Sequence, residues 1–217
     1  MGNQGAVAVC TPCRTCYDKA VMAAALPISI ITGYLLGGIP FGILVARFRG
    51  VDIMAVGTGN PGAANVFRRV GRPYGILVAL ADIAKGALAV LVARWLGLSA
   101  EVSLAAGAAA VVGHWHSPFL RFKGGTGLAA AIGAAFGVVP ELAAIGVAVS
   151  VAAIAWRKNV GVGAGLGYAA AFLVGLLLHR PVAVLLGATA TGVGVLGRSL
   201  LLDLMARRRR ESPPGSP

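Results

Sequence analysis

Long apolar stretches, separated by short polar segments rich in glycine and arginine, dominate the pattern along the chain. A transmembrane helix needs about 20 apolar residues in a row. Stretches of this kind lie at residues 21–46, 74–95, 102–119, 127–155, 160–178 and 182–196. Pro140 and Glu141 interrupt the fourth stretch, which therefore forms either one long span or two short ones. The pattern predicts an all-α, polytopic integral membrane bundle with six or seven transmembrane helices.

The composition excludes the soluble alternatives. Hydrophobic residues make up 58% of the chain and charged residues only 12%, and the mean hydropathy is +0.84. A soluble domain carries about 25% charged residues. So few charges cannot cover a surface that faces water, and so apolar a chain is not intrinsically disordered. The same shortage leaves no soluble basic face, so we expect no nucleic-acid partner despite the net charge of +12.

The positions of lysine and arginine favour seven spans over six. Cytoplasmic loops of membrane proteins carry an excess of these residues. With seven spans and an outer N-terminus, the cytoplasmic segments hold 14 of the 19, namely Arg47, Arg49, Arg68, Arg69, Arg72, Arg121, Lys123, Arg157, Lys158, Arg198, Arg207, Arg208, Arg209 and Arg210. With six spans the basic tail would face outward, so we expect seven.

We expect three regions along the chain: an N-terminal tail without regular structure at residues 1–20, an integral membrane domain at 21–198 and a basic cytoplasmic tail at 199–217. The first tail carries Cys10, Cys13 and Cys16. Their spacing allows metal binding, but it supplies three ligands with no nearby histidine or fourth cysteine. An unstructured tail without metal is the favoured interpretation, and the role of these cysteines stays open.

The first polar loop, at residues 56–69, combines glycines with amide, hydroxyl and guanidinium side chains. Glycines let backbone N–H groups approach an anion closely, Pro61 can open a short helix, and arginine binds phosphate with two parallel hydrogen bonds. The alternative is a flexible turn whose arginines anchor to lipid. The candidate phosphate ligands of this loop are Gly59, Asn60, Gly62, Asn65 and Arg68, and Thr58 is a candidate catalytic hydroxyl.

The second polar loop, at residues 113–127, again places glycines beside cations. Its candidate ligands are Lys123, Gly124, Gly125 and Thr126, with His114 as a candidate acid, base or hydrogen-bond donor. The alternative for His114 is a histidine paired inside the bundle. Two such loops on one side of the membrane predict a single composite site for an anionic substrate.

Asp82 and Lys85 lie inside the second span, three residues apart on one helix face, where they can pair. Each charge in a membrane costs about 2.5–3.5 kcal/mol on the insertion scale, so intramembrane charges indicate function by default. We favour a structural pair that shapes the floor of the pocket. A transport role is the alternative, since the glycine-rich spans and this pair also suit a small membrane transporter.

Three sets of residues carry a resemblance to a known family. Gly59, Asn60, Gly62, Asn65 and Arg68 match the pattern S-G-N-x-G-x-x-N-x-x-R, and Asp82-x-x-Lys85-Gly86 matches a pattern in the second span. The third pattern, G-H followed by F-L-x-F-K-G-G-K-G, is matched by Gly113, His114, Phe119, Leu120, Phe122, Lys123, Gly124, Gly125 and Gly127. The chain resembles the bacterial acyl-phosphate:glycerol-3-phosphate acyltransferase family.

This resemblance implies a seven-helix enzyme of the bacterial plasma membrane that needs no cofactor. It would bind acyl phosphate, glycerol 3-phosphate and membrane lipids, and move a fatty acyl group to the 1-hydroxyl of glycerol 3-phosphate. The product is lysophosphatidate, an early intermediate of phospholipid synthesis. By the same resemblance, the residues that line the phosphate site are Asn60, Asn65, Arg68, His114 and Lys123. The oligomeric state stays open.

The chain also departs from the family pattern. Thr58 stands where the family has serine, Thr126 replaces the second lysine of K-G-G-K, and residues 197–200 lack the histidine and asparagine of a further motif after the last span. These departures keep open a diverged relative that lacks this activity or uses another acceptor.

The sequence shows no Ser-His-Asp pattern. We therefore expect direct attack by the substrate hydroxyl, with His114 or a substrate phosphate as the base. Thr58, with Asn60, Arg68 and Lys123, would hold the anions.

Overall fold

A computed structural model describes residues 14–211 of the chain, and the side chains of residues 23–205. The helices, in chain order, are α1 (Arg14–Gly38), α2 (Phe41–Phe48), α3 (Ala63–Arg69), α4 (Arg72–Trp95), α5 (Ala100–Trp115), the 3₁₀ helix η1 (Pro118–Leu120), α6 (Leu128–Val138), α7 (Pro140–Arg157), α8 (Val160–Leu177) and α9 (Val182–Glu211). The described residues form no strand, and the all-α prediction is confirmed.

Within the described part of the chain, five candidate membrane spans are long and apolar enough to cross a bilayer: Ala23–Phe48, which covers most of α1 and all of α2, and four more within α4, α7, α8 and α9. Helices α5 and α6 have 16 and 11 residues. At 1.5 Å per residue they are about 24 and 16 Å long, short of the roughly 30 Å hydrocarbon core. The multi-pass membrane bundle is confirmed, whereas the count of seven spans is not.

The stretch 127–155 forms two helices rather than one, because α6 ends at Val138 and α7 begins at Pro140. Proline suits the first position of a helix, where its missing N–H costs no hydrogen bond. The outer boundaries also differ from those expected. Helix α1 begins at Arg14, inside the predicted tail, and α9 continues to Glu211. Cys10 and Cys13 lie outside the described residues, as does the side chain of Cys16, so the cysteine prediction stays open.

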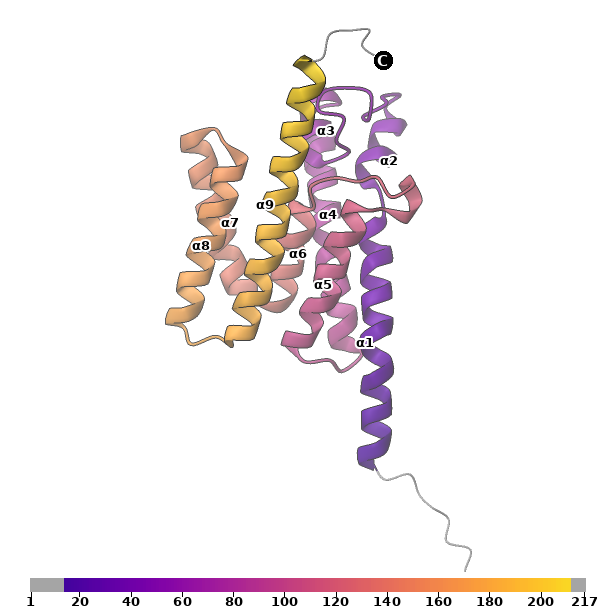
Figure 1. Cartoon of the computed structure of the whole chain (residues 1–217), viewed down its shortest axis with the longest axis vertical. Helices are drawn as coiled ribbons and strands as arrows, with labels where there is room; N and C mark the ends of the chain where they lie inside the picture. The colour runs from indigo at the N-terminus through magenta and orange to yellow at the C-terminus, as the bar shows by residue number, and fades with distance from the viewer. Residues whose placement is uncertain (1–13, 212–217) are drawn as a thin grey trace, which may run out of the picture.

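The polar segments that carry the predicted cytoplasmic arginines gather at one end of the bundle. Figure 1 shows α2, α3 and the C-terminal end of α9 at the same end, with the N-terminal end of α1 at the other. The loop between α5 and α6 also reaches this end, and α7 and α8 form a pair beside α9. The fold therefore brings the two glycine-rich loops into one region, as their charge pattern suggested.

Helices α1 and α5 approach closely because small residues line their contact. A Cβ atom on Gly33 or Gly37 would overlap the backbone carbonyl oxygen of Ala106 or Ala110, respectively. Glycines four residues apart allow such close approach in lipid, where packing rather than hydrophobicity drives association. This contact fixes the end of α1 against the end of α5, next to the second loop.

The first predicted span, 21–46, is not continuous, because the chain breaks between α1 and α2 at Ile39 and Pro40. Proline lacks an N–H donor and its ring clashes with a helical backbone, so the break releases nearby carbonyl groups from helical pairing. Ser117 Oγ donates a hydrogen bond to the Gly38 carbonyl at 2.6 Å, and Lys85 Nζ donates to the Ile39 carbonyl at 3.0 Å. Side chains from elsewhere in the chain thus complete the broken helix.

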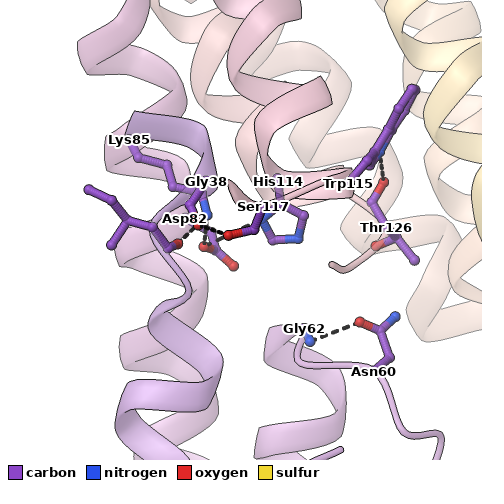
Figure 2. Close-up of polar contacts among 10 residues, drawn as sticks. Gly38, Asn60, Gly62, Asp82, Lys85, His114, Trp115, Ser117 and Thr126 are labelled. Atoms are coloured by element: carbon purple, nitrogen blue, oxygen red, sulfur yellow. Dashed lines mark hydrogen bonds and ion pairs between the residues drawn. The ribbon is translucent and has the colours of Figure 1, made fainter. Parts of the chain in front are cut away.

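The two charges of α4 form an ion pair, with Lys85 Nζ 2.7 Å from Asp82 Oδ1 (Figure 2). Both side chains are 3% exposed. Lys85 therefore serves two buried acceptors, the carboxylate of Asp82 and the carbonyl of Ile39. This arrangement gives the pair a structural purpose at the helix break.

We expect Lys85→Met to destabilise the protein strongly, because it leaves Asp82 as a buried, uncompensated charge. Removing one partner of a buried ion pair costs about 3–5 kcal/mol. Adding Asp82→Asn should recover part of this loss, because the carboxylate charge is then gone. Thermal unfolding in detergent micelles measures both effects.

Lys158→Met provides the matched control, because Lys158 is exposed at the end of α7, and it should unfold like the wild type. A Lys85→Met variant with the wild-type melting temperature would contradict this account. So would a double variant no more stable than the single one.

Candidate active site

Asn65 holds the first loop in shape from the inside. Its side chain is buried, and its Nδ2 atom donates to the carbonyl groups of Ile53, Val56 and Asn60 at 3.0–3.2 Å. Its Oδ1 atom accepts a hydrogen bond from the backbone N–H of Thr58 at 3.3 Å. From its residue type and its place in the motif, Asn65 is predicted to bind substrate directly. The structure directs its amide to the loop backbone, so its contribution is to set the shape of the loop.

The glycines of the first loop permit a tight path rather than supply donors. Gly57 and Gly59 both have φ of +65°, a left-handed conformation that glycine adopts without strain. The N–H of Gly59 donates to the Val56 carbonyl, and the N–H of Gly62 donates to Asn60 Oδ1 at 3.0 Å (Figure 2). Helix α3 begins at Ala63, after Gly62, and not at Pro61. Two of the N–H groups expected to face an anion are therefore used within the loop.

The second loop is a hairpin between α5 and α6. An isolated antiparallel bridge joins Ser117 to Lys123. Closer to the helices, the N–H of Gly125 donates to the His114 carbonyl at 3.1 Å. A Cβ on Gly124 would overlap that same carbonyl oxygen. The glycines thus let the returning arm of the loop lie directly against the end of α5, beside His114.

Two further side chains fasten the returning arm. The indole Nε1 of Trp115 donates to the Thr126 carbonyl at 2.7 Å (Figure 2). Arg198, which comes from α9, donates to the carbonyl groups of Gly125 and Trp115. From the sequence, Arg198 contributes only to the predicted topology and to a poorly matched motif. Its contacts place it in direct support of the second loop.

A small cavity lies where the two loops meet the broken first helix. Its lining consists of Gly37, Gly38, Ile39, Pro40, Phe41, Gly42, Pro61, Asp82, His114, Ser117, Leu120, Gly124 and Gly125. Figure 2 shows His114 beside Asp82 and Ser117, on the side of the helices, with the Asn60–Gly62 turn opposite. The cavity therefore draws on four separate parts of the chain.

The imidazole of His114 faces a different group with each nitrogen. Nδ1 lies 3.8 Å from Asp82 Oδ1. Nε2 faces Gly125, where a Cβ atom would lie 2.5 Å from Nε2 and 3.0 Å from Asn60 Oδ1. A proton on Nδ1 would face the carboxylate, which leaves Nε2 as the nitrogen that faces the loops. His114 is thus placed to exchange a proton on the side of the cavity.

Thr58, Arg68 and Lys123 do not line the cavity and are exposed on the loops that flank it. Neither cation has an ion-pair partner among residues 23–205. Their charges are therefore not neutralised by an acidic side chain in this part of the chain, and anion binding between the loops stays a prediction. The structure does not bring these three side chains into contact with His114.

The residues that match a known family extend over most of the chain. The profile of the family described as Glycerol-3-phosphate acyltransferase matches residues 27–204. The chain belongs to this family. The match includes both loops, the charge pair of α4 and the part of α9 that carries Arg198, so it covers every element of the cavity and its support.

Relatives in the family include a Deinococcus radiodurans protein, "Glycerol-3-phosphate acyltransferase 1", which is 44% identical over 154 residues, 71% of this chain and 78% of the relative. The Aquifex aeolicus glycerol-3-phosphate acyltransferase is 38% identical over 170 residues, 78% of this chain and 88% of its own.

Two crystal structures of PlsY, described as an integral membrane glycerol 3-phosphate acyltransferase, share the fold at 35% identity and cover 84% of this chain and 93% of theirs. The glycerol 3-phosphate form aligns with a TM-score of 0.75 and the lysophosphatidic acid form with 0.74.

The sequence did not predict the supporting roles of several residues. Ser117 joins the second loop to the Gly38 carbonyl, and Tyr34 Oη donates to the His116 carbonyl at 2.7 Å. Pro40, directly after two glycines and an isoleucine, was the available signal for the helix break. No local signal marks Ser117, Tyr34 or Arg198, because each acts on backbone that is distant in sequence.

We expect Gly125→Ala to reduce acylation of glycerol 3-phosphate by about 10- to 100-fold. The new methyl group would meet His114 Nε2 and Asn60 Oδ1, and displacement of a reacting group by about 1 Å can cost a factor of that size. Steady-state kinetics of the purified variant measures the effect. Gly165→Ala is the control, because its Cβ meets nothing within 4 Å, and it should keep wild-type rates. Wild-type rates for Gly125→Ala would contradict this placement of His114.

Proposed function

We propose that this protein transfers a fatty acyl group from acyl phosphate to the 1-hydroxyl of glycerol 3-phosphate and so forms lysophosphatidate. One observation carries the proposal: two glycine-rich loops flank a cavity lined by His114, and each loop has an exposed cation without an ion-pair partner among the described side chains. Both substrates carry phosphate, and arginine and lysine are the side chains that bind phosphate in this setting. Arg68 on the first loop and Lys123 on the second supply those charges.

The proposed chemistry needs no covalent enzyme intermediate. The substrate hydroxyl oxygen forms a bond to the acyl carbonyl carbon, and the bond from that carbon to the phosphate oxygen breaks. Phosphate leaves with the bonding electrons. The hydroxyl proton passes to His114 Nε2 or to a phosphate oxygen. Acyl phosphate is a mixed anhydride with a good leaving group, so the protein must mainly position the reactants and stabilise negative charge.

The residues have four different tasks in this proposal. Arg68, Lys123 and the exposed hydroxyl of Thr58 bind the phosphate groups. Asn65 sets the shape of the first loop, and Gly59, Asn60, Gly62, Gly124, Gly125 and Thr126 form the surface that the substrates approach. Asp82 and Lys85 support His114 and the helix break.

We also infer that the loops and the C-terminal end of α9 face the cytoplasm of a bacterial cell. The loops and helix ends that carry most of the arginines and lysines lie at this end of the bundle (Figure 1), and the positive-inside rule assigns such an end to the cytoplasm. Glycerol 3-phosphate and acyl phosphate would then reach the site from the side where metabolism makes them.

A second candidate is a family member that acylates another alcohol. Thr126 supplies no charge where the family pattern has lysine, and residues 197–200 contain neither histidine nor asparagine. That segment includes Arg198, which contacts the second loop. A changed side-chain set so close to the loop favours a changed acceptor.

Purified protein assayed with acyl phosphate and glycerol 3-phosphate should form lysophosphatidate, and acyl-CoA should not replace the donor. We expect Arg68→Ala to lower kcat/KM at least about tenfold, because a hydrogen bond to a charged group is worth about 1.5–3 kcal/mol. Arg157→Ala removes an exposed arginine at the end of α7, away from both loops, and should have no effect.

Full activity of Arg68→Ala would overturn the proposed site. Acyl transfer to a different alcohol, or none with either donor, would favour the diverged alternative over the proposed reaction.

A further inference from the structure

We propose that Arg198 is a positioning residue of the acyl-transfer site and that it acts by fastening the second loop from α9. The expected change in KM rests on the proposed function. The expected loosening of the second loop rests on the structure alone. It concerns a residue that lines no part of the cavity and touches no reacting atom.

The guanidinium of Arg198 joins both arms of the second loop. Its Nη2 atom donates to the Trp115 carbonyl at 2.8 Å, where the loop leaves α5. Its Nε atom donates to the Gly125 carbonyl at 3.0 Å, where the loop returns towards α6. One rigid, planar group therefore holds two carbonyl groups that are ten residues apart in the chain. A lysine ammonium lacks this planar fork and cannot reproduce both bonds in the same geometry.

Trp115 adds further contacts between α9 and the second loop. The Arg198 guanidinium lies over the indole ring at 5.7 Å from its centre, and the indole Nε1 donates to the Thr126 carbonyl. A Cβ on Gly194, one turn before Arg198 on α9, would lie 3.0 Å from the ring, so α9 packs directly against it. Val195 is buried with Val111 and Ala130, which fixes this part of α9 against α5 and α6. The arginine thus projects from a well-anchored helix.

The backbone that Arg198 holds in place is next to, or part of, the lining of the cavity. Trp115 directly follows His114, and Gly125 faces His114 Nε2. Lys123, the exposed cation of this loop, lies two residues before Gly125. Loss of Arg198 would remove one of the contacts that hold the returning arm and leave those from the Gly125 N–H and Trp115 Nε1, so the positions of Lys123 and Gly125 relative to His114 would become less fixed. The bundle would keep its packing, because Arg198 is itself partly exposed and contributes little to the core.

Kinetics of Arg198→Ala tests the role. We expect KM for glycerol 3-phosphate or acyl phosphate to rise about tenfold or more, since the anion site loses its fixed geometry, with a melting temperature near that of the wild type. Arg198→Lys should recover only part of the loss. Arg157→Ala is matched to it, since Arg157 also lies at this end of the bundle, over the Trp156 ring at 5.2 Å, and it should leave KM unchanged.

A second readout does not need turnover. With the two exposed tryptophans replaced, Trp95→Phe and Trp156→Phe, Trp115 is the single tryptophan of the chain, and its emission can be excited selectively over that of tyrosine. Arg198→Ala in this background should shift Trp115 emission to longer wavelength, because the guanidinium no longer shields the indole ring from water. If the parent protein has no acyl-transfer activity but this shift appears, the proposed function fails and the fastening stands.

Wild-type KM together with unchanged Trp115 emission in Arg198→Ala would overturn the inference while leaving the proposed function intact. Full recovery of KM by Arg198→Lys would also overturn it, because charge alone, rather than the two-carbonyl fork, would then suffice. A lower kcat at unchanged KM would indicate that part of the protein is inactive through general instability. That result would count against a positioning role.

Discussion

A helix that breaks inside a membrane must find hydrogen-bond partners for the carbonyl groups that the break releases, because lipid offers none. In this protein Lys85 and Ser117 meet that requirement at Ile39 and Gly38. The solution brings α4 and the second loop to the same point of the first helix. It also explains the buried Asp82, since a lysine charge at this depth needs a counter-charge. The cavity forms where these three elements converge.

The remaining supports also act on backbone. Asn65 binds the backbone of the first loop from its buried side. Arg198 and Trp115 bind the backbone of the second loop close to where it joins α5 and α6. These contacts leave Arg68 and Lys123 free at the exposed edge of the loops. A reaction with a good leaving group needs fixed geometry and positive charge more than it needs a nucleophile. A rigid frame with a few free cations is suited to that need.

The sequence predicted the helical membrane class, both loops and the pairing of Asp82 with Lys85, because hydropathy, glycine clusters and helical spacing are local signals. Four features were not predicted. The long apolar run of residues 21–46 outweighed the signal of Pro40, so the helix break was missed, and the span count depended on α5 and α6, which are shorter than a bilayer is thick. The inward direction of Asn65 and the reach of Arg198 depend on packing between distant segments. Their residue types alone suggested phosphate binding and topology.

The central claim is that two loops distant in sequence form one anion site. Direct binding of glycerol 3-phosphate to purified protein, measured by titration calorimetry without any acyl donor, tests it. Removing either cation, by Arg68→Ala or Lys123→Ala, should weaken binding about tenfold, and removing both should abolish measurable binding. Wild-type affinity in either single variant would contradict a shared site.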